Sequence, residues 1–232
     1  MNFKNVKVLG IIPARKGSKG VPNKNFAKIN KKKHLIDYTI LEAKKSKLLT
    51  KIALTTDDER IIEHTKKYKL DFVIKRKKKY STDYIKSIDV VLDVINIIKN
   101  IDVDLIMLLQ PTSPLRKSLH IDNSIKLLCN KHNKYNSLVS VCSFEEPHPV
   151  KLKKIKNNFL VPFLKNTSSE IPRQKLEKIY KLNGAIYLIK RKVLQNKKTF
   201  FHKTLPYIME EKFSLNIDTI NDLEFLKKIK KK

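Results

Sequence analysis

The segment VKVLGII, residues 6–12, runs directly into PARKGSKGVPNKN, residues 13–25, and this junction decides the expected fold. The first part is a short apolar run that ends at proline and glycine, a pattern typical of a buried strand followed by a loop. Three of the four glycines in the chain lie at positions 10, 17 and 20, among lysines and an arginine. Glycine lets backbone N–H groups approach an anion, and cationic side chains neutralise its charge. The loop is therefore either an anion site or a tight turn in a basic protein, since its spacing matches neither the Walker A nor the dinucleotide-binding glycine pattern.

Outward from this junction, apolar strand-like runs alternate with stretches that have apolar residues at helical spacing. The alternation is typical of an α/β fold with a mostly parallel, twisted sheet and helices on both faces, hence three layers. Ligands of such sheets bind at the carboxyl ends of the strands, where the basic loop lies. The predicted strands are 6–12, 52–56, 70–74, 104–110, 137–144 and 180–190, and the predicted helices are 35–43, a helix capped at 57–58 that runs through 64, 85–98, 119–129 and 223–229.

The segment 145–178 breaks this alternation, because prolines at 147, 149, 162 and 172 interrupt its short apolar pieces. We interpret it as an excursion from the main sheet, since 232 residues suit one substantial core and nothing demands a second. The expected organisation is a single domain over 1–232 that carries this excursion.

The net charge of +29 raises the question of a nucleic-acid partner. The positive charge is nearly all lysine, scattered in short basic runs such as 31–33 and 76–79. Base-edge recognition favours arginine, and single-strand binding favours interleaved aromatic residues. We therefore expect no specific nucleic-acid partner, only salt-sensitive adhesion to polyanions.

The two cysteines, Cys129 and Cys142, have no metal-ligand spacing, so we expect free thiols in the core of a cytoplasmic protein. No apolar run reaches the roughly 20 residues that a membrane-spanning helix needs, and no membrane contact is expected. Gly10, Pro13 and Arg15 interrupt the apolar run at the N-terminus, which argues against a secretory signal.

The basic loop closely resembles the N-terminal signature of the CMP-sialic acid synthetases, which are acylneuraminate and nonulosonate cytidylyltransferases. The family pattern is roughly A-R-x-x-S-K-G-x-x-x-K-N, and every fixed position is matched between Ala14 and Asn25. Further motifs follow in the family's order over essentially the whole chain: TTDDE (55–59), LLQPTSPLR (108–116), HPVK (148–151), PRQ (172–174), NGAIY (183–187) and NIDT (216–219).

This resemblance implies a Rossmann-like nucleotidyltransferase fold and a reaction. CMP would pass from CTP to the anomeric hydroxyl of a nine-carbon α-keto acid sugar of the N-acetylneuraminate or legionaminate type, with release of pyrophosphate. By position, it assigns catalytic contacts with the triphosphate to Arg15, Lys19 and Lys24. It also implies nucleotide-binding positions at Ala14, Gly17, Ser18, Gly20, Asn25, Arg76 and Ser87. Without the resemblance, Arg76 within KRKKK would be taken as an ordinary solvated charge.

For the sugar, the resemblance implies a contact from Gln110 at the end of a strand. It also implies that Lys151 and Arg173 reach the acidic sugar across the interface of a homodimer, so that 145–178 is a dimerisation arm. Tyr180, Phe200 and Phe201 match aromatic positions of the sugar pocket, although aromatic side chains at these places could equally belong to the core.

A metal site is implied at the other end of the chain. The family usually has D-x-D there to hold Mg²⁺ against the phosphates, a use of oxygen ligands that suits a hard cation. Here Asn216 stands at the first position and Asp218 is retained. An amide oxygen can coordinate but adds no negative charge, so we expect Mg²⁺ as the cofactor, with either a weakened affinity or reliance on Asp218 and the nucleotide phosphates.

Two alternatives remain open on the sequence. One is a nucleotidyltransferase for another keto-sugar acid or another base. The other, from a different class, is a basic polyanion-binding protein in which the glycine loop is only structural.

Overall fold

The structure is a computed structural model that describes residue 3 and residues 5–17, 20–144, 146–165 and 167–231. Strand β1 (Val8–Pro13) is apolar on both faces: Val8 and Ile12 pack into one core cluster, and Leu9 and Ile11 pack into another. Such a strand is typical of the interior of a parallel sheet that is covered on both sides. β1 is accordingly paired in parallel with β2 on one side and with β4 on the other.

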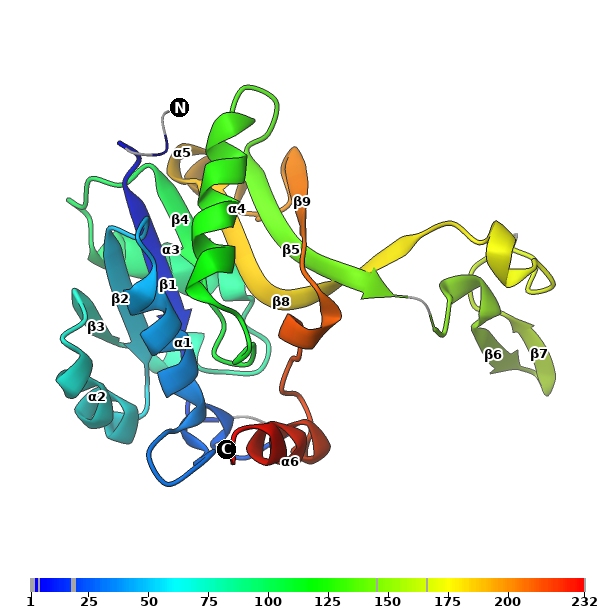
Figure 1. The fold of residues 1–232 in the computed structure, drawn as a ribbon, viewed down its shortest axis with the longest axis horizontal. Coiled ribbons are helices and arrows are strands. Elements are labelled where there is room, and N and C mark those ends of the chain that lie inside the picture. The colour runs from blue at the N-terminus through cyan, green and yellow to red at the C-terminus, as the bar shows by residue number, and fades with distance from the viewer. Residues whose placement is uncertain (1–2, 4, 18–19, 145, 166, 232) are drawn as a thin grey trace.

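The central sheet has seven strands in the order β3-β2-β1-β4-β8-β5-β9 (Figure 1). All run parallel to β1 except β8, which is antiparallel to both of its neighbours. The remaining strands of the sheet are β2 (Lys51–Thr56), β3 (Phe72–Lys75), β4 (Leu105–Leu108), β5 (Ser137–Phe144), β8 (Ile179–Lys190) and β9 (Thr204–Ile208). The prediction of a mostly parallel α/β sheet is confirmed.

Helices cover both faces of the sheet and complete the three layers. α1 (Leu35–Lys45), α2 (Glu59–Thr65) and α4 (Ser118–Asn130) contribute to the first core cluster, and α3 (Ser87–Ile97) and α5 (Arg191–Lys197) to the second. α6 (Ile220–Ile229) belongs to a third, smaller cluster that contains Val21, Ile29 and Ile217. This cluster packs the C-terminal helix beside the segment that follows the basic loop. Short 3-10 helices lie at Lys24–Phe26, Lys66–Tyr68, Lys78–Tyr80, Pro149–Lys151, Arg173–Lys175 and Glu211–Phe213.

Two elements of the main body are not predicted by the sequence pattern. α5 is short and polar, with one buried residue, Leu194, so it has little helical periodicity to detect. β9 is an edge strand that contains Pro206, a residue that argues against a strand when it is read from the sequence alone. The antiparallel direction of β8 is also unpredicted, since apolar patterning does not report strand direction.

The segment after β5 leaves the sheet as a projecting arm (Figure 1). It carries a two-stranded hairpin of β6 (Lys153–Lys156) and β7 (Phe159–Pro162), which pairs with no strand of the central sheet. Ile155, Phe159 and Leu160 are 78%, 72% and 69% exposed, so the hairpin has no core of its own in this chain. Residues 145 and 166 of the predicted excursion lie outside the described residues.

Cys129 and Cys142 are buried and unbridged, as expected. Within the part of the chain that the structure describes, none of the helices combines the length and the apolar character that crossing a bilayer requires.

Candidate active site

A cleft opens at the edge of the sheet where β1, β2, β3 and β4 end. Its walls come from the strand ends, from the loops that follow them and from the start of α3. Residues 15, 76 and 110 follow β1, β3 and β4, so tertiary structure brings them together from far apart in the chain. Among the predicted site residues, the cleft is lined by Arg15, Lys24, Asn25, Arg76, Ser87 and Gln110.

The basic loop is held at both ends by the acidic pair that follows β2. The Asp57 carboxylate accepts a hydrogen bond from the backbone N–H of Lys16 at 2.8 Å. Asp58 caps α2 and pairs with Arg60 at 2.6 Å, and Arg60 also donates to Asn23 at 2.8 Å. The hydrogen bond from Arg60 is the main cause of a lowered pKa of the Asp58 carboxyl. The TTDDE motif therefore positions the loop.

Arg15 and Arg76 both line the cleft, and different partners hold their guanidinium groups in place. Arg15 forms an ion pair with Asp83 at 2.6 Å and is partly exposed, so its guanidinium is accessible to a ligand. Arg76 is only 6% exposed and donates to the backbone carbonyl of Thr55 at 2.8 Å, which overturns its interpretation as an ordinary solvated charge. Burial lowers the pKa of the Arg76 guanidinium to about 10, so it keeps its positive charge near neutral pH.

Lys24 and Asn25 lie on the 3-10 helix Lys24–Phe26. The Lys24 ammonium donates to the backbone carbonyl of Ile217 at 2.7 Å and lies 3.3 Å from a carboxylate oxygen of Asp218. The Asn25 amide donates to the carbonyl of Arg15 at 2.9 Å, which ties the two ends of the loop to each other. Asn25 therefore acts on the loop as well as lining the cleft.

Gly20 lies against the C-terminal segment. A Cβ atom on Gly20 would clash with the backbone carbonyl oxygen of Asp218, so only glycine permits this approach. The backbone N–H of Ile217 donates in turn to the carbonyl of Thr112 at 2.8 Å. The NIDT segment is thus packed between the basic loop and the PTSP loop.

The donors predicted for magnesium lie in this segment. The Asn216 amide nitrogen donates to the Asp218 carboxylate, and the Asn216 amide oxygen is buried without a hydrogen-bond partner. An orphaned amide oxygen next to a carboxylate fits the oxygen-ligand chemistry of Mg²⁺. These two side chains carry one formal negative charge, that of Asp218, and the Lys24 ammonium already pairs with it.

Gln110 lies beside the glycine of the NGAIY motif. Gly184 has a φ of +72°, and a Cβ atom there would lie 3.0 Å from the Gln110 side-chain oxygen. Arg116 fixes the backbone of the same loop, because it donates to the carbonyls of Gln110 at 3.3 Å and Ala185 at 2.8 Å and to the Thr39 hydroxyl at 2.8 Å. Burial lowers the pKa of Arg116 to about 9, so this fully buried guanidinium stays charged near neutral pH.

The predicted aromatic group is not assembled as expected. Tyr180 is 41% exposed and pairs with Ser143, toward the arm end of β8. The aromatic residue that meets Phe200 and Phe201 is Tyr187, with ring centroids 5.5 Å and 6.4 Å apart. Tyr180 lies seven positions before Tyr187 on β8, and among the described residues no ring contact joins Tyr180 to Phe200 or Phe201.

Phe200 and Phe201 differ in burial. Phe200 is 6% exposed and belongs to the second core cluster, whereas Phe201 is 55% exposed. Tyr187 pairs with Leu108, two residues before Gln110, and burial raises the pKa of its phenol. Tyr187 ends the NGAIY motif, packs against the second core cluster and is not among the residues that line the cleft.

Lys151 and Arg173 lie together on the arm and away from the cleft. The Lys151 ammonium donates to the backbone carbonyl of Ile171 at 3.0 Å, and Arg173 pairs with Glu146 at 3.2 Å. Both line one hollow beside Leu176. The chain alone does not bring these two residues to Gln110.

Three further predicted positions belong to the loop and its base. Ala14 is fully buried, and its backbone N–H donates to the carbonyl of Thr55 at 2.9 Å, so it supports the loop from below. Gly17 is exposed, and a Cβ atom added to it would meet no described atom within 4 Å beyond its chain neighbours. Ser18 and Lys19 lie outside the described residues.

Known proteins are similar to this chain in sequence and in fold. N-acylneuraminate cytidylyltransferase of Escherichia coli is 34% identical over 97% of this chain, and the chain spans 52% of that protein. CMP-N,N'-diacetyllegionaminic acid synthase of Legionella pneumophila is 30% identical over 97% of this chain and 96% of its own length. The chain therefore spans about half of the first relative and nearly all of the second.

A solved structure of CMP:2-keto-3-deoxy-manno-octonic acid synthetase complexed with CTP superposes with a TM-score of 0.72, covering 96% of this chain and 98% of that one. At 18% identity this likeness shows the fold. A family model described as "Cytidylyltransferase" matches residues 9–232 of this chain. These residues include the whole cleft and the NIDT segment. This chain belongs to the cytidylyltransferase family.

Proposed function

We propose that this protein transfers CMP from CTP to the anomeric hydroxyl of a nonulosonic acid. The observation that carries the proposal is the convergence of Arg15, Lys24 and Arg76 on one cleft at the carboxyl edge of the sheet, with Gln110 in the same cleft. Three cations suit a triphosphate, and an uncharged amide beside them suits a polar sugar. Relatives named for neuraminate and legionaminate chemistry support this class of acceptor.

The reaction joins the sugar oxygen to the α-phosphorus of CTP. The bond between the α-phosphorus and the bridging oxygen to the β-phosphate breaks, the hydroxyl proton is released, and pyrophosphate leaves. Such phosphoryl chemistry depends on positioning and on neutralising charge. Lys24 and Arg15 would balance the charge on the triphosphate and on the leaving pyrophosphate. Asp83 would hold the Arg15 guanidinium in place until the phosphates take over as its partner.

Mg²⁺ is the proposed cofactor, held by the Asn216 amide oxygen and the Asp218 carboxylate, and it would neutralise phosphate charge when bound. Asn216→Asp is expected to lower the Mg²⁺ concentration for half-maximal rate several-fold, because it restores a second carboxylate. The matched control is Asn100→Asp, which adds the same charge at an exposed position after α3. An Asn216→Asp variant with the same Mg²⁺ requirement as the parent would remove Asn216 from the metal site.

We further propose that the protein is a cytoplasmic homodimer in which the arm crosses to the partner. The exposed apolar side chains of the β6–β7 hairpin need a covering surface. In the assembled dimer, Lys151 and Arg173 would supply positive charge near the sugar carboxylate.

The test is a pyrophosphate-release assay with CTP, Mg²⁺ and a panel of N-acetylneuraminate, legionaminate and other keto-sugar acids, with products identified by mass. We expect a CMP-sugar from at least one nonulosonic acid and little turnover when CTP is replaced by another nucleotide. Turnover with a different base would support the alternative nucleotidyltransferase. Absence of pyrophosphate with every acceptor, together with tight and salt-sensitive binding of polyanions, would favour the noncatalytic alternative.

A further inference from the structure

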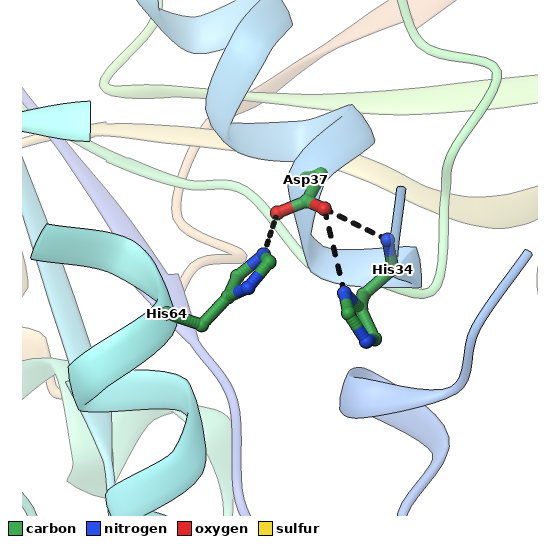
Figure 2. Close-up of side chains that lie close together, drawn as sticks. All are labelled: His34, Asp37 and His64. Atoms are coloured by element: carbon green, nitrogen blue, oxygen red, sulfur yellow. Dashed lines mark hydrogen bonds and ion pairs between the residues drawn. The ribbon is translucent and has the colours of Figure 1, made fainter. Parts of the chain in front are cut away.

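Two histidines and a buried aspartate converge beside the basic loop, outside the cleft (Figure 2). His34 is the N-cap residue of α1, Asp37 lies in the first turn of that helix, and His64 lies in the last turn of α2. One nitrogen of each imidazole and one carboxylate oxygen lie within 4.8 Å of one another. The proposed nucleotide chemistry uses none of these three residues.

Asp37 is the centre of the cluster. It is fully buried, and its carboxylate accepts a hydrogen bond from the backbone N–H of His34 at 2.7 Å and contacts His64 Nε2 at 2.7 Å. Among the ion pairs of the described residues, Asp37 meets the two imidazoles and neither lysine nor arginine. The Tyr68 hydroxyl also hydrogen-bonds to this carboxylate, but in the described part of the chain no lysine or arginine pairs with it. A bound cation would supply the positive charge that a buried carboxylate favours.

His34 has an unused nitrogen that faces this carboxylate. Its Nδ1 is buried without a hydrogen-bond partner and lies 3.8 Å from Asp37 Oδ2. Buried polar atoms are nearly always hydrogen-bonded, so an orphan at this place indicates an absent partner.

We propose that His34, Asp37 and His64 bind one zinc-class divalent cation. Two imidazoles and one carboxylate suit Zn²⁺ and its neighbours in the first transition row, whereas Mg²⁺ prefers oxygen ligands. A tetrahedral ion with bonds of about 2.0 Å holds its ligand atoms about 3.3 Å apart. The three ligand atoms now lie within 4.8 Å of one another, so small side-chain rotations would bring them to that spacing. Water would complete the fourth position.

The surroundings point to a structural role for this ion. The Phe26 ring stacks on His34 with centroids 4.2 Å apart and meets His64 edge-on at 5.4 Å. Phe26 is the last residue of the 3-10 helix that carries Lys24 and Asn25. A cation here would join α1 to α2 and hold the base of the loop through Phe26.

The test measures metal binding without CTP, in excess Mg²⁺ so that the oxygen-ligand site is not counted. We expect one Co²⁺ per chain with the visible absorption of a tetrahedral site, displacement of Co²⁺ by Zn²⁺, and a rise in the unfolding midpoint with either ion. His34→Gln and His64→Gln should each weaken binding at least about 100-fold. His132→Gln is the matched control, since it removes another half-buried histidine far from the cluster.

The proposal fails if the parent protein binds no stoichiometric Co²⁺ or Zn²⁺, in which case the three residues form only a hydrogen-bonded cluster. It also fails if a folded double variant, His34→Gln with His64→Gln, binds the metal as the parent does. Circular dichroism of each variant verifies the fold, and neither result depends on transferase activity.

Discussion

Replacing Lys24 by alanine is expected to lower kcat/KM for CTP about 100- to 1,000-fold, the usual cost of removing one preorganised charge-stabilising donor. The Lys24 ammonium is mostly shielded from solvent, lines the cleft and is already held by the Ile217 carbonyl at 2.7 Å. It therefore meets the phosphates without further ordering. Steady-state pyrophosphate release at saturating sugar measures the loss.

Lys190→Ala is the matched control for this variant. The Lys190 ammonium also donates to a backbone carbonyl at 2.7 Å, that of His132, but it lies at the opposite edge of the sheet. Each variant removes a hydrogen bond from a lysine ammonium to one backbone carbonyl, so we expect similar, modest losses of stability. Only Lys24→Ala should also lose activity. Equal kcat/KM values in the two variants would show that Lys24 only supports the Ile217 segment.

Gly20→Ala is expected to lower kcat/KM about 100-fold, because displacements of about 1 Å near a site can cost that much. The added methyl group would meet the backbone carbonyl of Asp218, which cannot rotate away as a side chain could. The loop and the NIDT segment must then separate, and Lys24 and Asp218 move with them. Overpacking of this kind costs about 1–3 kcal/mol, so the unfolding midpoint should also fall by several degrees.

Gly17→Ala separates this effect from a general intolerance of the loop to alanine. Gly17 lies in the same loop, has no described atom within 4 Å of its Cβ position beyond its chain neighbours, and does not adopt a positive φ. Its unfolding midpoint should match that of the parent within about 1 °C, the shift expected for less than about 0.5 kcal/mol in a domain of this size. If both variants unfold at the parent's midpoint, the approach of Gly20 to Asp218 does not matter to stability.

Much of the fold follows from patterns within short segments. The apolar run at 6–12 becomes β1, the run at 137–144 becomes β5 over the same residues, and Asp58 caps α2. Local apolar spacing and capping chemistry suffice here, because each element buries the face that its own sequence marks. β9 and α5 escape such prediction because their contacts, rather than their composition, stabilise them.

The candidate site divides in the same way. The loop and its companion motifs identify Arg15, Lys24 and Gln110, which the structure does bring to one cleft. The aromatic assignments do not follow in the same way, because an aromatic residue looks the same in the sequence whether it packs in the core, as Phe200 and Tyr187 do, or lines a site. His34 and His64 are missed as a pair, since 30 positions separate them and no metal-binding spacing links them.

The sequence by itself determined the α/β class, the position of the basic loop after the first strand, and the family, because these depend on local patterning and ordered motifs. Tertiary structure alone decided that the TTDDE pair anchors the loop, that Arg76 is buried, and that Gly20 is required by Asp218 rather than only by a phosphate. The physical reason is that burial and close approach arise from segments far apart in the chain. Nearly 200 positions separate the basic loop from the NIDT segment, and only folding places one against the other.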